Sequence, residues 1–193
     1  MDYYIHPTAI VEAGAKIGSG TKVWLYSHLM PDCEVGERCQ IGQGVYVGRG
    51  VKIGNGVKVQ NHVSIYENVE IEDDVFCGPS MVFTNVINPR AFIERKHEFK
   101  RTLIKKGASI GANATLVCGI VCGRYSFIGA GAVVTKNVPD YALVTGVPAR
   151  QRAWVCQCAV QLLEVKKDHY SCPECTKNYI FHQEDGLKEN HGD

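Results

Sequence analysis

The sequence predicts an all-β fold, a parallel β-solenoid made of six-residue repeats, and three observations support this prediction. A hydrophobic residue stands at every sixth position from Ile5 to Phe83. The same spacing returns from Ile104 to Val134. Counted from this hydrophobic residue, the fourth position of thirteen of the twenty repeats is Gly, Asn or Asp, which adopt a positive φ most readily. A period of six is neither the ~3.6 of a helix nor the two of a simple strand, so it indicates a coil of short strands and corners.

The first block of repeats, residues 5–87, predicts about four and a half coils, and the second block predicts about two more. Three repeats complete one coil, so residues eighteen apart should stack at the strand spacing of ~4.8 Å. Each inward hydrophobic residue contributes on the order of 1.5–3 kcal/mol of burial, which chain entropy largely offsets. The coils must therefore support one another. We expect left-handed corners at the fourth positions, including His62 and Asn137.

The two blocks are separated by an excursion. The spacing from Phe83 to Ile104 is not a multiple of six, so a loop must leave the solenoid at about residues 88–103. The loop is locally basic, with Arg and Lys outnumbering Glu, and a long loop on a rigid solenoid is commonly functional. It suits an anionic ligand, and the alternative is a solvated segment that packs on a neighbouring subunit.

The tail abandons the period, which divides the chain into a solenoid domain, 1–153, and a Cys-rich module, 154–193. Its Cys-x-Cys and Cys-Pro-x-Cys motifs predict a zinc-ribbon-like tetrathiolate site, although the first motif is one residue shorter than usual. The alternative is four reduced thiols in a frayed tail. The predicted ligands are Cys156, Cys158, Cys172 and Cys175.

Five further cysteines lie in the repeats. Four of them occupy inward positions and should be small core residues, whereas Cys118 falls outside those positions and is not assigned. The four core residues are Cys33, Cys39, Cys77 and Cys122.

The bulk composition restricts the class of partner. The net charge is +1, which gives no global field for nucleic acid or membrane binding. No apolar run reaches the ~18 residues of a spanning helix, and the first residues lack the pattern of a signal peptide. We therefore expect a cytoplasmic protein with reduced thiols.

Four stretches of the chain carry a resemblance to a known family: VQNHVSIYENV (59–69), VFCGPSMVFTNVINPRAFIERK (75–96), IKKGASIGANATLVCG (104–119) and GAGAVVTKNVPDYALVTGVPARQ (129–151). They resemble the acetyltransferases that act on UDP-2-acetamido-3-amino-2,3-dideoxy-D-glucuronate in surface polysaccharide (O-antigen) biosynthesis. The resemblance implies a left-handed β-helix, acetyl-CoA as co-substrate, and a homotrimer with sites between subunits. The dTDP-3-amino-6-deoxyhexose N-acetyltransferases share much of the pattern and are the nearest alternative.

Two other classes of protein are alternatives. Hexapeptide-repeat proteins also include the γ-class carbonic anhydrases, which need three histidines with one pair spaced His-x4-His. The solenoid repeats contain His6, His28 and His62 and no such pair, which argues against that class. A trimeric scaffold without catalytic activity, whose tail binds a protein or nucleic acid, is the remaining alternative.

The predicted catalytic residues are Asn85, which would orient the substrate amine, and Glu67, which would take a proton or hold Asn85. They are eighteen apart and should stack beside the basic loop. Asn61 could join this cleft across a subunit boundary. His62 is a rival base, but a structural corner is the better interpretation, and the resemblance implies that the departing CoA sulfur accepts the proton.

The remaining predicted site residues would bind acetyl-CoA or the sugar nucleotide. Small residues in the second block would let pantetheine lie along backbone amides, and cations would meet the phosphates of CoA. The donor residues are Gly111, Ala112, Gly129, Ala130, Lys136 and Arg150, with Arg152 beside them. The sugar-nucleotide residues are Arg90, Arg95, Lys96, Tyr66, His28 and Trp24, with His28 facing outward near Trp24.

Overall fold

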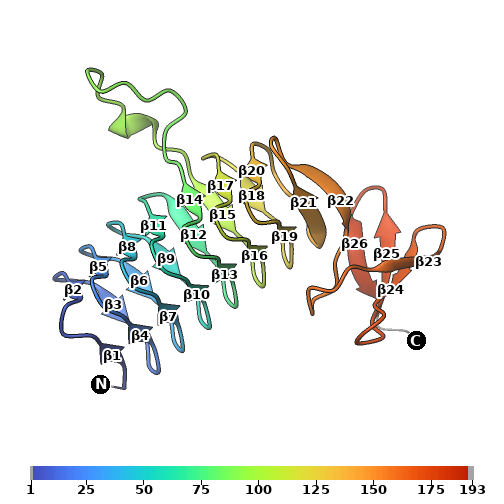
Figure 1. Cartoon of the computed structure of the whole chain (residues 1–193), viewed down its shortest axis with the longest axis horizontal. Helices are drawn as coiled ribbons and strands as arrows, with labels where there is room; N and C mark the ends of the chain where they lie inside the picture. Colours follow the sequence, from blue (N-terminus) through green and yellow to red (C-terminus); the bar gives the residue numbers. More distant parts are fainter. Residues whose placement is uncertain (1, 191–193) are drawn as a thin grey trace.

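The computed structural model describes residues 2–190, which form a three-sided parallel β-solenoid followed by a small antiparallel sheet (Figure 1). Sheet A contains β1 (Tyr4–Ile5), β4 (Lys22–Val23), β7 (Gln40–Ile41), β10 (Lys58–Val59), β13 (Phe76–Cys77), β16 (Ser109–Ile110), β19 (Phe127–Ile128), β21 (Ala142–Thr145) and β22 (Arg150–Trp154). Sheet B contains β2 (Ile10–Val11), β5 (His28–Leu29), β8 (Tyr46–Val47), β11 (Ser64–Ile65), β14 (Val82–Phe83), β17 (Thr115–Leu116) and β20 (Val133–Val134). Sheet C contains β3 (Lys16–Ile17), β6 (Glu34–Val35), β9 (Lys52–Ile53), β12 (Val69–Ile71), β15 (Thr102–Ile104) and β18 (Val121–Cys122).

The register confirms the coil of three repeats. Ile5 pairs with Val23 in sheet A and Val11 pairs with Leu29 in sheet B, so residues eighteen apart are neighbours on successive coils. The inward positions form one continuous core, which includes all four cysteines predicted to lie there. Cys118 is buried as well, with 4% of its surface exposed, although it lies outside that core cluster.

The corners adopt the predicted left-handed conformation. Eight glycines at the fourth positions have positive φ, and non-glycine residues do the same, among them His62 with φ 60°. The prediction is wrong at Asn137, whose backbone is not left-handed. Its side-chain oxygen instead accepts a hydrogen bond from the Val121 backbone at 2.8 Å, because the chain is leaving the repeat there.

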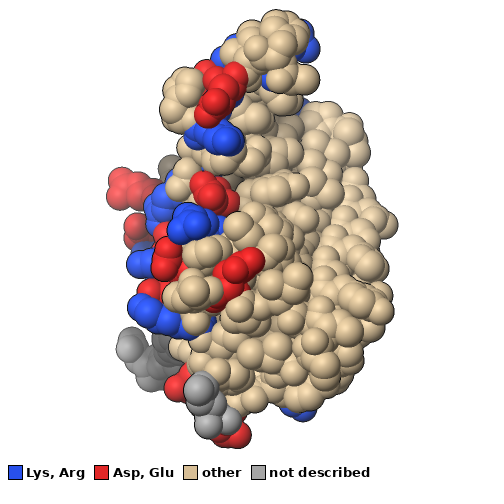
Figure 2. Space-filling model, turned by 90° about the vertical axis from the view of Figure 1, so that its left-hand side faces the viewer, with Lys and Arg blue, Asp and Glu red and all other residues tan. Residues whose placement is uncertain are grey.

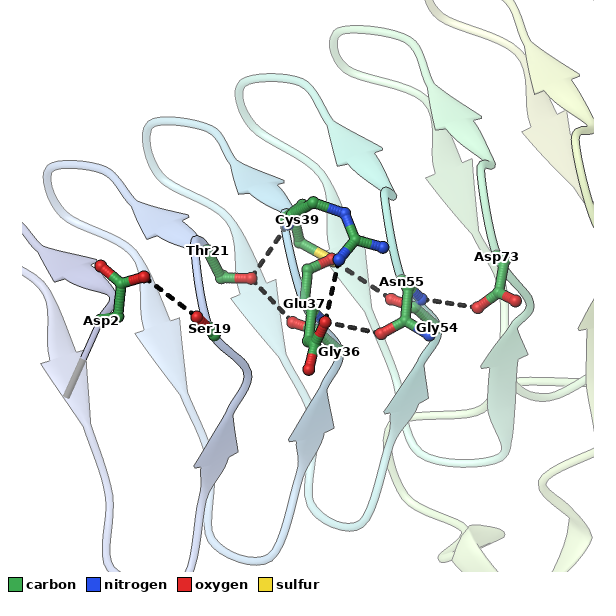
Figure 3. A network of polar contacts seen from close by, with 10 residues as sticks. Asp2, Ser19, Thr21, Gly36, Glu37, Cys39, Gly54, Asn55 and Asp73 are labelled. Carbon is green, nitrogen blue, oxygen red and sulfur yellow. Dashed lines mark hydrogen bonds and ion pairs between the residues drawn. The ribbon is translucent and has the colours of Figure 1, made fainter.

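Polar side chains connect one coil to the next along the corner between sheets C and A (Figure 3). The Asn55 side-chain oxygen accepts from the Glu37 backbone N–H at 2.8 Å, and Asp73 accepts from the Asn55 N–H at 2.7 Å. The buried Thr21 hydroxyl donates to the Gly36 carbonyl and accepts from the Cys39 N–H. These contacts satisfy backbone groups that the short strands leave without a ladder partner.

The excursion runs between β14 and β15, residues 84–101, and projects from the solenoid (Figure 1). It therefore begins and ends earlier than predicted, and Thr102 and Leu103 belong to β15. A short 3₁₀ helix, η1 (Lys96–Glu98), is its one helical turn in the described chain. The ends are joined where Lys100 N–H donates to the Asn85 carbonyl at 3.1 Å.

Formal charges are distributed unevenly around the solenoid. Viewed from its N-terminal end, Lys, Arg, Asp and Glu gather on one side, and the opposite side is almost free of them (Figure 2). The charged side includes sheet C, where Lys16 contacts Glu34 at 2.9 Å and Arg101 contacts Glu70 at 2.5 Å. The strands of sheet B and the corners that join sheets A and B contain no Lys, Arg, Asp or Glu. No helix within residues 2–190 is long and apolar enough to cross a membrane.

The solenoid ends where β22 pairs antiparallel with β21, so β22 passes through the boundary predicted at residue 153. The chain then forms a four-stranded antiparallel sheet of β23 (Leu163–Lys166), β24 (His169–Ser171), β25 (Asn178–His182) and β26 (Gly186–Asn190). We call residues 154–190 the C-terminal cap. Tyr141 of the last coil packs on Tyr179 of the cap, with ring centroids 5.3 Å apart.

Candidate functional site

Glu67 and Asn85 lie on adjacent coils, as predicted. They follow β11 and β14 of sheet B, which pair through Ser64 and Val82. Glu67 is exposed and Asn85 is half-buried at the point where the loop leaves. No hydrogen bond joins the two side chains within residues 2–190, so Glu67 does not hold Asn85 in this single chain.

Glu67 borders a depression of about 410 Å³ on the side of sheet C. Arg49 and Arg101 also line it, and each already has a carboxylate partner: Asp32 at 3.1 Å and Glu70 at 2.5 Å. Arg49 is not among the predicted site residues. Its position eighteen residues before Glu67 is the signal that could have found it.

An aromatic ladder runs along the outer face of sheet B. His28 contacts Tyr46 edge-on with centroids 6.0 Å apart, and Tyr46 contacts Tyr66 at 6.1 Å. His28 Nε2 also lies 3.1 Å from a Glu12 carboxylate oxygen. Burial raises the pKa of Tyr46, and the nearby Glu67 and Tyr66 add to the effect. Tyr46 was missed, although it lies eighteen residues after His28.

Trp24 follows a strand of sheet A and packs on Tyr4, with ring centroids 5.6 Å apart, whereas His28 packs on Tyr46. Trp24 and Asn61 share a groove of about 420 Å³. The Asn61 side-chain oxygen accepts from the Gln43 backbone N–H at 2.9 Å, which is the same inter-coil role that Asn55 has. The neighbouring His62 is exposed at its left-handed corner.

The loop is less available to an anion than its sequence predicts. Arg95 makes an ion pair with Glu98 at 2.7 Å, and its Nε atom is buried without a hydrogen-bond partner. Lys96 lies 4.0 Å from Glu94. Within the described chain, exposed Arg90 and Lys100 have no ion-pair partner, so these two loop cations remain available.

The predicted donor residues fall into two groups. Gly111, Ala112, Gly129 and Ala130 stack on successive coils at the uncharged corner, where a Cβ on Gly111 would come within 2.4 Å of the Ala130 nitrogen. Glycine is required there by the close approach of the two backbones. Lys136 and Arg150 instead share a cavity of about 360 Å³ at the last coil.

The four predicted metal ligands come together in the C-terminal cap. The sulfurs of Cys156, Cys158, Cys172 and Cys175 all lie within 4.8 Å of one another. Cys156 and Cys172 are buried, and the other two are exposed.

Comparison with known proteins places this geometry in a family. Residues 14–49 match the family "Bacterial transferase hexapeptide (six repeats)", and residues 33–67 and 103–136 match "Hexapeptide repeat of succinyl-transferase". The chain is 47% identical over 178 residues, 92% of its length and 91% of the relative's, to a dTDP-3-amino-3,6-dideoxy-alpha-D-galactopyranose 3-N-acetyltransferase from Aneurinibacillus thermoaerophilus.

Two solved structures have the same fold. A hexapeptide-repeat acetyltransferase from Vibrio cholerae superposes with a TM-score of 0.53 at 23% identity, over 72% of this chain and 73% of that one. A galactoside acetyltransferase in complex with coenzyme A gives a TM-score of 0.51 at 26% identity, over 57% and 59%. The repeats, the parallel β-solenoid and the near full-length relative show that this chain belongs to the hexapeptide-repeat acyltransferases, among the sugar-nucleotide N-acetyltransferases of that family.

Proposed function

We propose that the protein transfers the acetyl group of acetyl-CoA to the 3-amino group of a dTDP-linked 3-amino-3,6-dideoxyhexose. The observation that carries this proposal is the 47% identity to a dTDP-3-amino sugar 3-N-acetyltransferase, which extends across the solenoid, the loop and most of the tail. The stacked small residues at the uncharged corner are compatible with a pantetheine chain that lies along backbone amides.

The UDP-linked 3-amino uronate remains the second candidate, because the sequence stretches around the loop resemble enzymes that use it. A uronate adds a carboxylate, which needs a cationic partner. Arg95 is paired with Glu98, so exposed loop cations such as Arg90 and Lys100 would have to supply that charge.

The chemistry requires a neutral amine whose lone pair is aligned on the thioester carbonyl. The C–N bond forms, the C–S bond breaks, and the proton lost by nitrogen passes to the departing CoA thiolate. In this proposal Asn85 accepts a hydrogen bond from the amine and orients it. Glu67, exposed in the adjacent coil, binds the sugar or relays the proton.

A homotrimer would complete the site. Sheet B and the corner that joins it to sheet A lack formal charges, and contacts between subunits favour surfaces depleted of charge. Trp24, Asn61 and the aromatic ladder lie on this side, whereas Glu67 lies at its edge. A neighbouring subunit could therefore bring Asn61 to the Glu67–Asn85 corner. A role in surface polysaccharide synthesis and a cytoplasmic location stay predictions.

The decisive experiment incubates the protein with acetyl-CoA and a matched set of nucleotide sugars while thiol release is followed. The set contains dTDP-3-amino-3,6-dideoxygalactose, its 3-hydroxy analogue, and UDP-2-acetamido-3-amino-2,3-dideoxy-glucuronate. We expect the highest kcat/KM with the dTDP amine and no turnover with the hydroxy analogue. Preference for the UDP-uronate would select the second candidate, and no thiol release with any amine would reject the activity.

A further inference from the structure

We propose that Cys156, Cys158, Cys172 and Cys175 bind one Zn²⁺ ion as a closed tetrathiolate site, and that this ion fastens the C-terminal cap to the last coil of the solenoid. The proposal rests on the geometry of the cap alone and is independent of the proposed acetyl transfer.

The spacing of the sulfurs matches a tetrahedral ion. Zn–S bonds of ~2.3 Å place the sulfurs of a tetrahedral site about 3.8 Å apart. Here Cys156 and Cys175 are separated by 3.3 Å and Cys158 and Cys172 by 3.5 Å, and all four sulfurs lie within 4.8 Å. All four cysteines are free thiols, so the cluster is not a pair of disulfides.

The two cysteine turns have matching backbones, despite the shorter first motif. Cys156 N–H donates to the Val160 carbonyl at 2.8 Å, and Cys172 N–H donates to the Lys177 carbonyl at 2.9 Å. A left-handed residue follows the second cysteine of each turn: Ala159 with φ 71° and Thr176 with φ 60°. The missing residue of Cys-x-Cys therefore does not prevent the two turns from facing each other.

Backbone amides lie beside the sulfurs, as a thiolate requires: that of Val160 beside Cys158, those of Glu174 and Cys175 beside Cys172, and that of Lys177 beside Cys175. Four thiolates and Zn²⁺ carry a net charge of about −2, which these dipoles partly offset. The nearby Lys177 ammonium is paired with Glu189 at 2.7 Å. Four protein ligands leave no open position, so the site is structural rather than catalytic.

The cluster is connected directly to the solenoid. The Tyr179 hydroxyl lies 3.1 Å from the Cys156 sulfur, and its ring packs on Tyr141 of the last coil. Tyr141 stacks in turn on Tyr125 with centroids 5.4 Å apart. Val155 N–H donates to the Tyr141 carbonyl at 2.8 Å. Ordering at the metal therefore orders the surface that contacts the solenoid.

The cap cannot hold itself together by burial alone. Within residues 154–190 its buried apolar side chains are few: Val155, Leu162, Tyr179 and Leu187, beside two of the cysteines. Burial of these few side chains has to offset the backbone entropy of every residue that is ordered. A small domain in this position usually needs a metal or a disulfide, and metal binding then supplies the folding free energy.

The first test measures metal in the full chain, purified with reductant and without added metal. We expect about one zinc per chain, and a Co²⁺-exchanged sample should show the visible absorption of tetrahedral thiolate ligation. Cys175→Ser removes an exposed ligand and should lose most of the zinc. Cys118→Ala is the matched control outside the cluster and should retain it. Zinc well below one equivalent, with no Co²⁺ spectrum after reconstitution, would overturn the metal site.

The second test asks whether the ion fastens the cap. Zinc is removed with a chelator, and trypsin cleavage is followed by mass spectrometry while circular dichroism reports the solenoid. We expect new cleavage at Lys166, Lys167 and Lys177 with little change in the β signal, and protection on adding Zn²⁺ back. Loss of zinc with an unchanged cleavage pattern would overturn the fastening role. Neither test depends on the acetyl acceptor.

Discussion

Single residues in this fold act by repetition, because each position has neighbours eighteen residues before and after it. Thr21 and Ser27 show the effect. Both are buried polar residues at inward positions, and each hydroxyl donates to a carbonyl of the next coil at 2.7 Å. Cys39 donates its S–H to the Gly54 carbonyl at 3.1 Å. A small polar residue is therefore tolerated inside wherever a corner carbonyl is within reach.

The buried thiols predict an alkaline weakness of the solenoid. Burial raises the pKa of both Cys77 and Cys122 to about 12. Their folded pKa exceeds the unfolded value of ~8.5, so their contribution to stability is complete below that value and is lost as pH rises toward 12. The free energy of unfolding should fall between pH 9 and 11 in denaturant titrations. The Cys77→Ala/Cys122→Ala double variant should show a shallower decline, and an equal slope would contradict the assignment.

Asn85→Ala tests the assigned role in orienting the amine. If the side chain acts mainly in the transition state, kcat should fall by about 10²-fold while the Kd for CoA changes less than about twofold. Steady-state kinetics and calorimetric titration with CoA measure the two effects. Asn178→Ala, an exposed change in the C-terminal cap, is the matched control. Unchanged turnover in Asn85→Ala would discard the role.

At the scale of elements, sheet C carries a ladder of alternating charge. The neighbours Lys16, Glu34, Lys52 and Glu70 occupy successive strands in register. The hydrogen bond from Lys16 lowers the pKa of the Glu34 carboxyl. The alternation makes every cross-strand pair attractive instead of repulsive.

Glu34→Lys should replace two attractive neighbours by two repulsive ones. Because the side chains are exposed, we expect a decrease in melting temperature of only about 1–3 °C at low salt, and a smaller decrease at 1 M salt. Thermal melts at both ionic strengths measure it. Glu34→Gln separates loss of attraction from repulsion and should have the smaller effect. A decrease that does not respond to salt would show that packing, not charge, is responsible.

The loop is an element that the solenoid does not need for its fold. Asn85 and Lys100 are already joined by a backbone hydrogen bond, and the Asn68 side chain donates to the Phe99 carbonyl at 3.3 Å. Replacement of residues 88–97 by a short Gly-Ser linker should change the melting temperature by only a few degrees, since loop closure depends weakly on length. Acetyl transfer should be lost. A replaced chain with full activity would remove the loop from the site.

At the scale of the whole molecule, the uneven distribution of charge separates a solvated side from a side suited to association (Figure 2). Val82 lies on the uncharged side in sheet B, with 45% of its surface exposed. The faces of the solenoid are flat, and their surface repeats from coil to coil. Such a face is well shaped to meet a second copy.

If the proposed homotrimer forms through sheet B, Val82→Glu should weaken it by placing an unpaired carboxylate in the interface. Sedimentation velocity should show a shift from trimer to smaller species at micromolar concentration. Val165→Glu is the same substitution at a residue of the C-terminal cap that is 65% exposed, and it should leave the trimer intact. A wild-type protein that sediments as a monomer would reject the proposed assembly at once.

The coil, the core and most corners are predictable from the sequence, because each strand pairs with the strand eighteen residues away and the period gives this register directly. The inward position of Cys77 and the left-handed corner at His62 were predictable for this reason. The sequence also shows the four cysteines that we propose as zinc ligands, in two short motifs. The register across the loop could not be predicted from the period. In the structure Ile104 pairs with Ile71, thirty-three residues earlier.

The tertiary structure also decided which charges are available and which side chains meet. Several contacts depend on side-chain directions that the six-residue pattern does not describe. Examples are the ion pair of Arg95 with Glu98, the packing of Trp24 on Tyr4, and the contact of Tyr179 with Cys156. The six-residue period identifies the side chains that face inward, because the core has the same apolar environment in every coil. For outward residues it gives only the register, as at Lys16 and Glu34, and not which side chains make contact.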